Sequence, residues 1–334
     1  MIMFNKHNLH NKVGGDKTYP LRLHNTICVI IRSTTIHVKQ HIMNRSSQKF
    51  LYHDSETATT EHAAALIVAK AYRAVAERGR FLMVLAGGNS PRILYKRLAQ
   101  GVSGELLEHY KLPLPDGWSK SRETLHQLPE KSWFFMGDER CLPVDHPESN
   151  ERMIRETLLP HSGIGENHLV RMAGEMADTE EAAREYEGAI RSFFPIEERG
   201  TSDKFPRFDL MLLGLGDDGH TASLFADNAE ALQEQNRWVI ALNAPFGKPP
   251  GKRLSLTLPV INHARNILFF ATGKAKSELA ELIFLEEEKN VPASFVRPKN
   301  GTVFWFTSNK SSPPMLAHGN EPDRIAEVEI LPHP

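Results

Sequence analysis

Residues 208–225 read FDLMLLGLGDDGHTASLF, and this stretch decides the fold. It begins as a short apolar run, passes through glycines and a pair of aspartates, and reaches His220 before the chain turns toward a short helix. A strand-to-helix turn at the end of a buried strand is where open α/β sheets build their ligand sites. Glycine lets the backbone approach a ligand closely, and histidine exchanges a proton near neutral pH. The stretch therefore indicates an enzyme or a small-molecule binder.

Similar units lie on both sides of this stretch. Apolar side chains at helical spacing predict a helix over residues 56–78, and the continuous run FLMVLA predicts a buried strand over residues 81–86. Further strands are expected at residues 132–136, 209–214, 238–242, 254–258, 266–271 and 302–306, with helices from Pro91 and over residues 149–159, 179–194 and 274–287. Residues 101–131 are expected to form a loop. Strands that alternate with helices predict a mostly parallel, three-layer α/β/α domain.

Composition narrows the class of protein. The chain has 334 residues and a net charge of −1, which gives no support for nucleic-acid binding as its main role. Its apolar runs are strand-sized, so no membrane span is expected. Two cysteines fit a reducing compartment rather than a disulfide scaffold. We expect a cytoplasmic protein.

The two ends differ from the middle of the chain. Residues 1–45 carry seven lysines and arginines against one acid, Asp16, and we expect a disordered or non-native extension there, with Met43 as a candidate start. The alternative is a targeting arm, although no signal peptide is visible. Residues 46–310 are expected to form the main domain. The tail over residues 311–334 is expected to pack weakly or not at all.

A possible anion site follows the strand at residues 81–86. Residues 87–91, GGNSP, place free backbone N–H groups at the start of a helix, and this geometry binds phosphate. The alternative is a tight turn without a ligand, because neither the dinucleotide nor the P-loop glycine pattern is present.

A second strand end carries charge. Residues 137–143 read GDERCLP, and we expect the charged side chains to face solvent or to line a pocket. Arg140 can contact a phosphate or carboxylate in bidentate fashion, or stabilise a developing oxyanion. Cys141 is interpreted as a small apolar filler.

His220 is the candidate acid–base group. A lone histidine is usually structural, but this one follows a strand on a glycine-flanked turn with Asp217 and Asp218 close by. A carboxylate beside an imidazole fixes its orientation, which favours a general-base role. No spacing typical of a zinc site stands nearby. Two further basic segments, ending in Arg253 and Lys276, flank strands and can reach an anion, although ordinary solvated side chains are the alternative. Three separated anion-binding candidates and one acid–base candidate in one domain suggest a phosphorylated small substrate.

These motifs together resemble one family. Five segments are similar to the 6-phosphogluconolactonase family: LAGGNSPRILYKRLA (85–99), WFFMGDERCLPVDHPESNERMIRETLL (133–159), residues 208–225, KPPGKRLSLTLPVINHARNILFFATGKAKSEL (248–279) and VPASFVRPKNGTVFW (291–305). The resemblance implies a modified Rossmann-like α/β/α fold, shared with glucosamine-6-phosphate deaminase and ribose-5-phosphate isomerase. It also implies hydrolysis of 6-phospho-D-glucono-1,5-lactone to 6-phosphogluconate in the oxidative pentose phosphate pathway, with no metal or other cofactor.

The resemblance assigns roles to individual residues. His220 matches the general base that activates water, Asp218 the aspartate beside it, and Arg140 an arginine that contacts the oxyanion or substrate, with no covalent intermediate. The residues expected to bind the substrate and its phosphate are Gly87, Gly88, Asn89, Ser90, Asp138, Glu139, Arg253 and Lys276. Asn89 stands where the family usually has serine or threonine, and residues 104–131 look longer than usual.

Two other functions remain as alternatives. A glucosamine-6-phosphate deaminase shares the fold, but its D-G-H-I-A-F-N-E-P and M-D-E-Y turns differ from the sequences here. A non-catalytic sugar-phosphate sensor is the other. The expected partner is a small phosphorylated sugar lactone, with no nucleic acid and no membrane, and the protein is expected to be a monomer or a small homo-oligomer.

Overall fold

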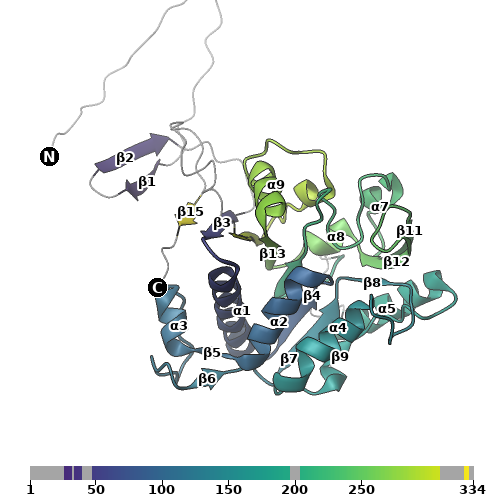
Figure 1. The fold of residues 1–334 in the computed structure, drawn as a ribbon, viewed down its shortest axis with the longest axis horizontal. Coiled ribbons are helices and arrows are strands. Elements are labelled where there is room, and N and C mark those ends of the chain that lie inside the picture. The colour runs from purple at the N-terminus through teal and green to yellow at the C-terminus, as the bar shows by residue number, and fades with distance from the viewer. Residues whose placement is uncertain (1–25, 32–33, 40–46, 196–203, 309–326, 331–334) are drawn as a thin grey trace, which may run out of the picture. The chain divides into compact units, whose positions relative to one another are not determined.

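The computed structural model describes residues 26–31, 34–39, 47–195, 204–308 and 327–330 (Figure 1). The chain divides into two units, residues 1–43 and 44–334. In the first unit, β1 (Thr26–Ile31) and β2 (Thr34–Lys39) pair antiparallel. Much of the predicted extension lies outside the described residues, so its disordered or non-native character stays a prediction.

The second unit is built on a parallel sheet. Its eight strands pair in the order β15 (Glu327–Ile330), β3 (Ser47–His53), β14 (Thr302–Ser308), β13 (Asn266–Thr272), β10 (Leu210–Leu213), β4 (Phe81–Leu85), β7 (Ser132–Met136) and β9 (Leu169–Val170). Every neighbouring pair is parallel. The predicted mostly parallel α/β fold is confirmed. β15 falls in the predicted tail and pairs with β3.

Helices cover both faces of this sheet. Connections from β3, β4 and β7 all run one way along the sheet, and later connections run back. Right-handed crossovers therefore place the two sets of helices on opposite faces. The first set is α1 (Glu56–Arg78), α2 (Asn89–Gln100) and α4 (Asn150–Thr157), and the second is α5 (Thr179–Phe193), α8 (Leu258–Ile261) and α9 (Lys274–Phe284). Figure 1 shows α1, α2 and α4 as neighbours, apart from α8 and α9.

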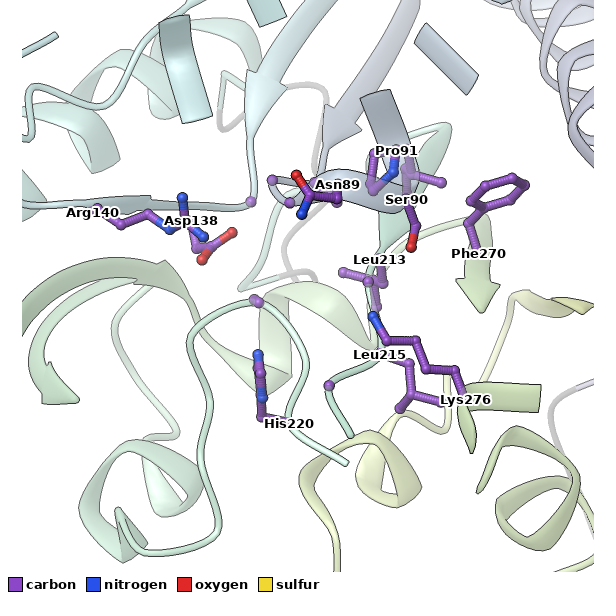
Figure 2. Close-up of a pocket in the computed structure, with 18 residues that line it drawn as sticks. Asn89, Ser90, Pro91, Asp138, Arg140, Leu213, Leu215, His220, Phe270 and Lys276 are labelled. Carbon is purple, nitrogen blue, oxygen red and sulfur yellow. The ribbon is translucent and has the colours of Figure 1, made fainter. Parts of the chain in front are cut away.

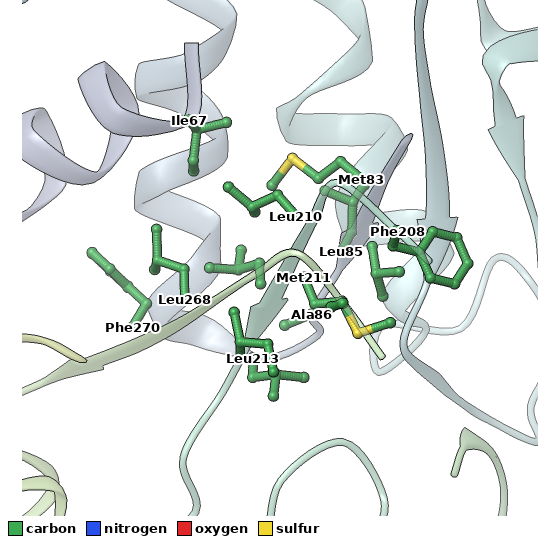
Figure 3. Packing of buried hydrophobic residues seen from close by; sticks show 14 of the residues in the cluster. Ile67, Met83, Leu85, Ala86, Phe208, Leu210, Met211, Leu213, Leu268 and Phe270 are labelled. Atoms are coloured by element: carbon green, nitrogen blue, oxygen red, sulfur yellow. The ribbon is translucent and has the colours of Figure 1, made fainter. Parts of the chain in front are cut away.

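The core lies around the central strand β10. All four of its residues are buried, and they pack with Met83 and Leu85 of β4 and with Leu268 and Phe270 of β13 (Figure 3). A strand covered on both faces needs apolar side chains on both, which is why the sequence reads as a continuous apolar run.

The predicted loop over residues 101–131 holds regular elements. It contains β5 (Val102–Ser103), α3 (Gly104–His109) and β6 (Leu125–His126), and β5 pairs with β6. The side chain of Ser103 accepts a hydrogen bond from the backbone N–H of Leu106, which caps α3. A further short helix, α7, spans Ala229–Gln233.

A small antiparallel sheet stands beside the main one. It joins β11 (Val239–Ala244), β12 (Gly251–Leu256) and β8 (Asp138–Arg140) in that order. The strand predicted over residues 254–258 begins and ends earlier in the structure, at Gly251 and Leu256. It ends before residue 258 because α8 begins at Leu258, with Pro259 in its first turn. The register places Arg253 of β12 opposite Arg140 of β8.

The topology fixes where a ligand site can form. From β4 the chain continues to β7 on one side, and from β10 it continues to β13 on the other, although β4 and β10 are neighbours. This is a topological switch point, and ligands of open α/β sheets bind outside the carboxyl ends of the strands there.

Candidate active site

Turns after four neighbouring strands surround one pocket. It is lined by residues 86–91 after β4, Gly137, Asp138 and Arg140 after β7, His220 after β10, and Lys276 of α9 after β13 (Figure 2). A second cavity adjoins the first, because Arg140, His220 and Lys276 line both. The second is also lined by Asp218 and Arg253.

The loop GGNSP opens α2 without a side-chain cap. Gly88 is the N-cap residue and has a φ of 94°, a left-handed value that favours glycine. Because no side chain caps this end, the first backbone N–H groups of α2 are available to an anion. The helix begins at Asn89, so Pro91 is its third residue rather than its first. Asn89 and Ser90 both line the pocket.

His220 and Asp218 form a tight pair. His220 Nδ1 lies 2.5 Å from Asp218 Oδ1, which also accepts a hydrogen bond from the backbone N–H of His220 at 3.2 Å. The side-chain hydrogen bond lowers the pKa of Asp218 to about 2. Since the carboxylate is therefore ionised at neutral pH, Nδ1 carries the hydrogen and Nε2 of a neutral ring is left to accept a proton.

The turn around this pair requires glycine. A Cβ at Gly216 would lie 2.1 Å from His220 Nδ1 and 2.5 Å from Asp218 Oδ1. The backbone N–H of Gly216 donates to the carbonyl of His220 at 2.9 Å, which closes the turn. The ring of His220 also contacts that of Phe225, with centroids 4.5 Å apart. From the sequence, these glycines were expected to let the backbone approach a ligand. The structure gives Gly216 a second role, because a side chain there would collide with the His220–Asp218 pair.

Two arginines lie side by side across β8 and β12. Arg253 is 3% exposed, and its guanidinium donates to the carbonyls of Lys252, at 3.2 Å, and Pro249. Burial and the charge of Arg140 lower the pKa of Arg253. Among the described residues, no carboxylate forms an ion pair with Arg253, and Arg140 has only Glu148, 3.7 Å away. Such a pair of positive charges favours an anion in the adjoining cavity.

The adjacent residues Asp138 and Glu139 have different surroundings in the structure. Asp138 lines the pocket, and its Oδ2 accepts a hydrogen bond of 2.7 Å from Ser223 Oγ in the His220 turn. Glu139 is 2% exposed and is not among the pocket residues. Its oxygens accept hydrogen bonds from the backbone N–H groups of Asn150 and Glu151, which begin α4. They also accept from the backbone N–H of Arg140 and the hydroxyl of Ser149. Burial raises the pKa of Glu139 to about 7.

The expectation that every charge in GDER faces solvent or a pocket is therefore wrong for Glu139. A buried carboxylate is tolerated here because the N-terminus of α4 supplies N–H donors to it. Sequence reasoning also missed Ser223 as a hydrogen-bond partner of Asp138. It gave no role to Phe246, which is 77% exposed and lines the second cavity.

Neither a metal cluster nor a membrane helix is found in the described part of the chain. There, no three His, Cys, Asp or Glu side chains are grouped so as to hold a metal ion. No helix among the same residues is both long enough and apolar enough to cross a bilayer.

Comparison with known proteins identifies the class. Residues 54–305 match the family described as glucosamine-6-phosphate isomerases/6-phosphogluconolactonase, and the chain belongs to this family. It is 37% identical over 253 residues to a 6-phosphogluconolactonase of Synechocystis, covering 75% of this chain and 91% of that one. It is 36% identical over 231 residues to the human 6-phosphogluconolactonase, covering 69% and 78%.

Solved structures agree with the fold. The 6-phosphogluconolactonase of Thermotoga maritima superimposes with a TM-score of 0.60 at 27% identity, covering 79% of this chain and 100% of that one. The enzyme from Trypanosoma cruzi gives a TM-score of 0.61 at 29% identity, covering 81% and 97%. The chain is similar to these proteins over most of the length of each.

Proposed function

We propose that this protein hydrolyses 6-phospho-D-glucono-1,5-lactone to 6-phosphogluconate. The observation that carries the proposal is the oriented His220–Asp218 pair, which lines the same pocket as an uncapped helix N-terminus and a partly uncompensated arginine. Relatives named 6-phosphogluconolactonase, 37% and 36% identical, support the same reaction. The substrate is a free small molecule; the net charge of −1 fits an enzyme that binds no nucleic acid, and the two cysteines fit a cytoplasmic location.

His220 acts as the general base in this proposal. Water donates a proton to Nε2 as its oxygen attacks the lactone carbonyl carbon, and Asp218 stabilises the imidazolium that results. The tetrahedral intermediate then expels the ring oxygen, which takes the proton back from Nε2 as the carbon–oxygen bond breaks. A lactone is an activated ester, so an oriented base and a nearby cation suffice.

Arg140 stabilises the developing oxyanion, and the phosphate is held at the other end of the substrate. The backbone N–H groups of residues 87–90 bind it at the start of α2, with Lys276, which lines both cavities, supplying positive charge, and Arg253, beside Arg140 in the second cavity, adding to the positive field. No covalent intermediate is needed. Ser223 Oγ donates to Asp138 rather than to His220, which supports water as the nucleophile.

A product assay tests the proposal against its alternatives. The protein is given either the phosphorylated lactone or glucosamine-6-phosphate, and 6-phosphogluconate and ammonia are measured. We expect 6-phosphogluconate well above the spontaneous rate, and no ammonia. Ammonia release would favour a deaminase, while tight product binding without turnover would favour a sensor.

A further inference from the structure

Asn150 lies between two parts of the pocket without lining it. It is the first residue of α4 and is 2% exposed. Its Nδ2 donates to the backbone carbonyl of Asp138 at 3.0 Å and lies 3.5 Å from Asp138 Oδ1. The side chain therefore holds the turn that carries Asp138 and Arg140.

The same amide packs against the phosphate-binding loop. A Cβ at Gly87 would lie 2.0 Å from Asn150 Oδ1, 2.2 Å from its Cγ and 2.3 Å from its Nδ2. Gly87 is not among the glycines with positive φ, so its backbone conformation is open to alanine. The absence of a side chain at residue 87 is therefore required by Asn150 and not by backbone conformation.

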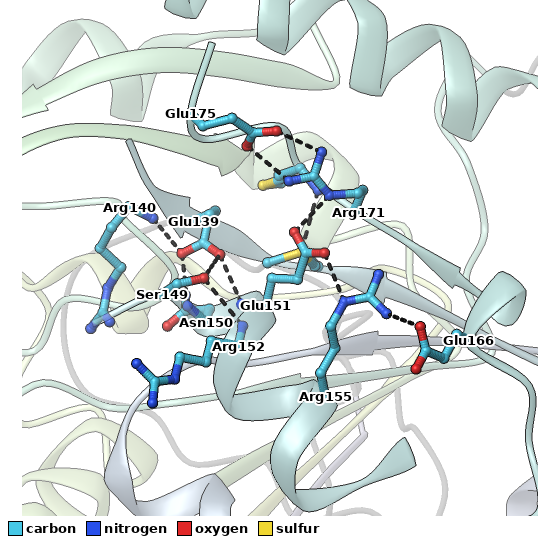
Figure 4. A network of polar contacts seen from close by, with 12 residues as sticks. Glu139, Arg140, Ser149, Asn150, Glu151, Arg152, Arg155, Glu166, Arg171 and Glu175 are labelled. Carbon is cyan, nitrogen blue, oxygen red and sulfur yellow. Dashed lines mark hydrogen bonds and ion pairs between the residues drawn. The ribbon is translucent and has the colours of Figure 1, made fainter. Parts of the chain in front are cut away.

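Asn150 is itself held firmly. Glu139 accepts hydrogen bonds from the backbone N–H of Asn150 at 2.9 Å and from that of Glu151 at 2.8 Å (Figure 4). The carboxylate of Glu151, 3% exposed, pairs with Arg155 at 2.9 Å and Arg171 at 2.7 Å. These bonds fix the start of α4 and, with it, the position of the amide.

One atom of this amide has no evident structural use. Asn150 Oδ1 is buried and has no hydrogen-bond partner among the described residues. A buried acceptor left without a partner costs stability, and such costs persist where a position serves function.

We propose that Asn150 is a positioning residue that sets the distance between the phosphate-binding loop and the Asp138–Arg140 turn. This inference rests on the proposed function. A sugar phosphate has a limited reach, because its ring is rigid and only the bonds between ring and phosphorus rotate, so a phosphate anchored on residues 87–90 delivers the lactone carbonyl to Arg140 and His220 only when that distance is right. Displacements of about 1 Å cost up to roughly a hundredfold in rate.

A double-substitution cycle tests the contact. Gly87→Ala adds a methyl group against the amide and should lower kcat/KM at least tenfold by displacing the loop. Asn150→Ala should also lower kcat/KM, because the bond to Asp138 is lost. In the double variant the methyl group has room, so kcat/KM should lie within about threefold of Asn150→Ala alone.

The cycle has a readout that a purely structural residue would leave unchanged. Gly87→Ala should lower the ratio of kcat/KM for the phosphorylated lactone to that for gluconolactone, and the double variant should restore it to the value of Asn150→Ala. Gly188→Ala is the matched control, since a Cβ there would meet nothing within 4 Å. It should change neither quantity in either background.

The outcomes separate this inference from the proposed function. An active wild-type protein in which the two substitutions reduce kcat/KM multiplicatively would overturn the role of Asn150 and leave the function standing. A wild-type protein without lactonase activity would overturn both. Near-ultraviolet circular dichroism checks that each variant is folded, and Asn150→Ser replaces Asn150→Ala if the latter is not.

Discussion

At the scale of single residues, the chemistry of the site depends on which nitrogen of His220 carries the hydrogen and on whether the charge of Arg253 is paired. The ionised Asp218 accepts a hydrogen bond from Nδ1 of His220, which leaves Nε2 as the acceptor of a neutral ring. Arg253 is buried beside Arg140 without a carboxylate partner among the described residues, so its charge is available to a ligand. These two features carry the first two predictions.

His220→Ala should lower kcat at least a hundredfold, because general-base catalysis contributes about 10² to 10⁴ in rate. Binding of 6-phosphogluconate should change little, since the proposed phosphate and arginine contacts do not involve His220. Stopped-flow kinetics and calorimetry measure the two quantities. A variant as active as the wild type would remove His220 from the mechanism.

Arg253→Ala should raise KM for the phosphorylated lactone tenfold or more, because a charge-assisted hydrogen bond contributes about 1.5–3 kcal/mol. The rate with unphosphorylated gluconolactone should stay the same. Lys252→Ala, at the neighbouring exposed side chain, is the control and should leave both unchanged. An unaltered KM in Arg253→Ala would argue against a phosphate contact.

At the scale of elements, buried polar groups join strand ends to helices. Glu139 ties β8 to the start of α4, and the charged side chains of Glu151, Arg155 and Arg171 continue the network toward the surface (Figure 4). A second buried polar pair lies where β3 meets α1: His53 Nε2 is 3.1 Å from His62 Nδ1. Each of these two arrangements should contribute to the free energy of unfolding in a way that a substitution can measure.

Glu139→Ala should lower the free energy of unfolding by about 3 kcal/mol, because three backbone N–H groups lose their acceptor. Activity should fall as well, since the Arg140 turn loosens. Urea unfolding measures the change. Glu166→Ala, at the exposed end of the same network, should cost less than about 1 kcal/mol. Equal costs for the two variants would show that Glu139 is not an anchor.

His62 should make stability depend on pH. Burial, with the neighbouring His53 and His109, lowers its pKa from 6.5 to about 3. The unfolded chain binds a proton at a higher pH than the folded one, so the free energy of unfolding falls as pH drops from 6.5 toward 3. The slope is at most about 1.4 kcal/mol per pH unit.

The variant His62→Phe should lack this contribution, and phenylalanine can keep the stacking of the ring on Tyr110. Between pH 6.5 and 5.5, the wild type should lose about 1 kcal/mol more stability than the variant. Urea unfolding at both pH values measures the difference. Parallel pH profiles for the two proteins would exclude His62 as the source.

At the scale of the whole molecule, the fold brings distant segments to one pocket, and this explains what the sequence alone revealed. The buried strands could be predicted, because β4 and β10 are covered on both faces and read as apolar runs. The glycine-containing turns after these strands also indicated the site, because glycine lets the backbone approach a ligand closely. Gly88, His220 and Lys276 could be placed together, because parallel strands end at one edge of the sheet.

Other features depend on contacts between residues far apart in sequence, and no local pattern reports those. The pairing of β8 with β12, which sets Arg140 beside Arg253, is one example. The burial of Glu139 is another example. Its charge predicts exposure, but in the structure backbone N–H groups at the start of α4 donate hydrogen bonds to it and allow it to be buried. Asn150 and Ser223 have no pattern of their own, and only their contacts with Asp138 distinguish them.

The measurement that tests the central claim most directly is stopped-flow hydrolysis of freshly generated 6-phosphogluconolactone, compared with unphosphorylated gluconolactone. The spontaneous opening of each lactone is subtracted. The site described here predicts fast cleavage of the phosphorylated lactone and a much lower kcat/KM for the other. Equal rates would contradict the phosphate site, and no acceleration of either would contradict the proposed reaction.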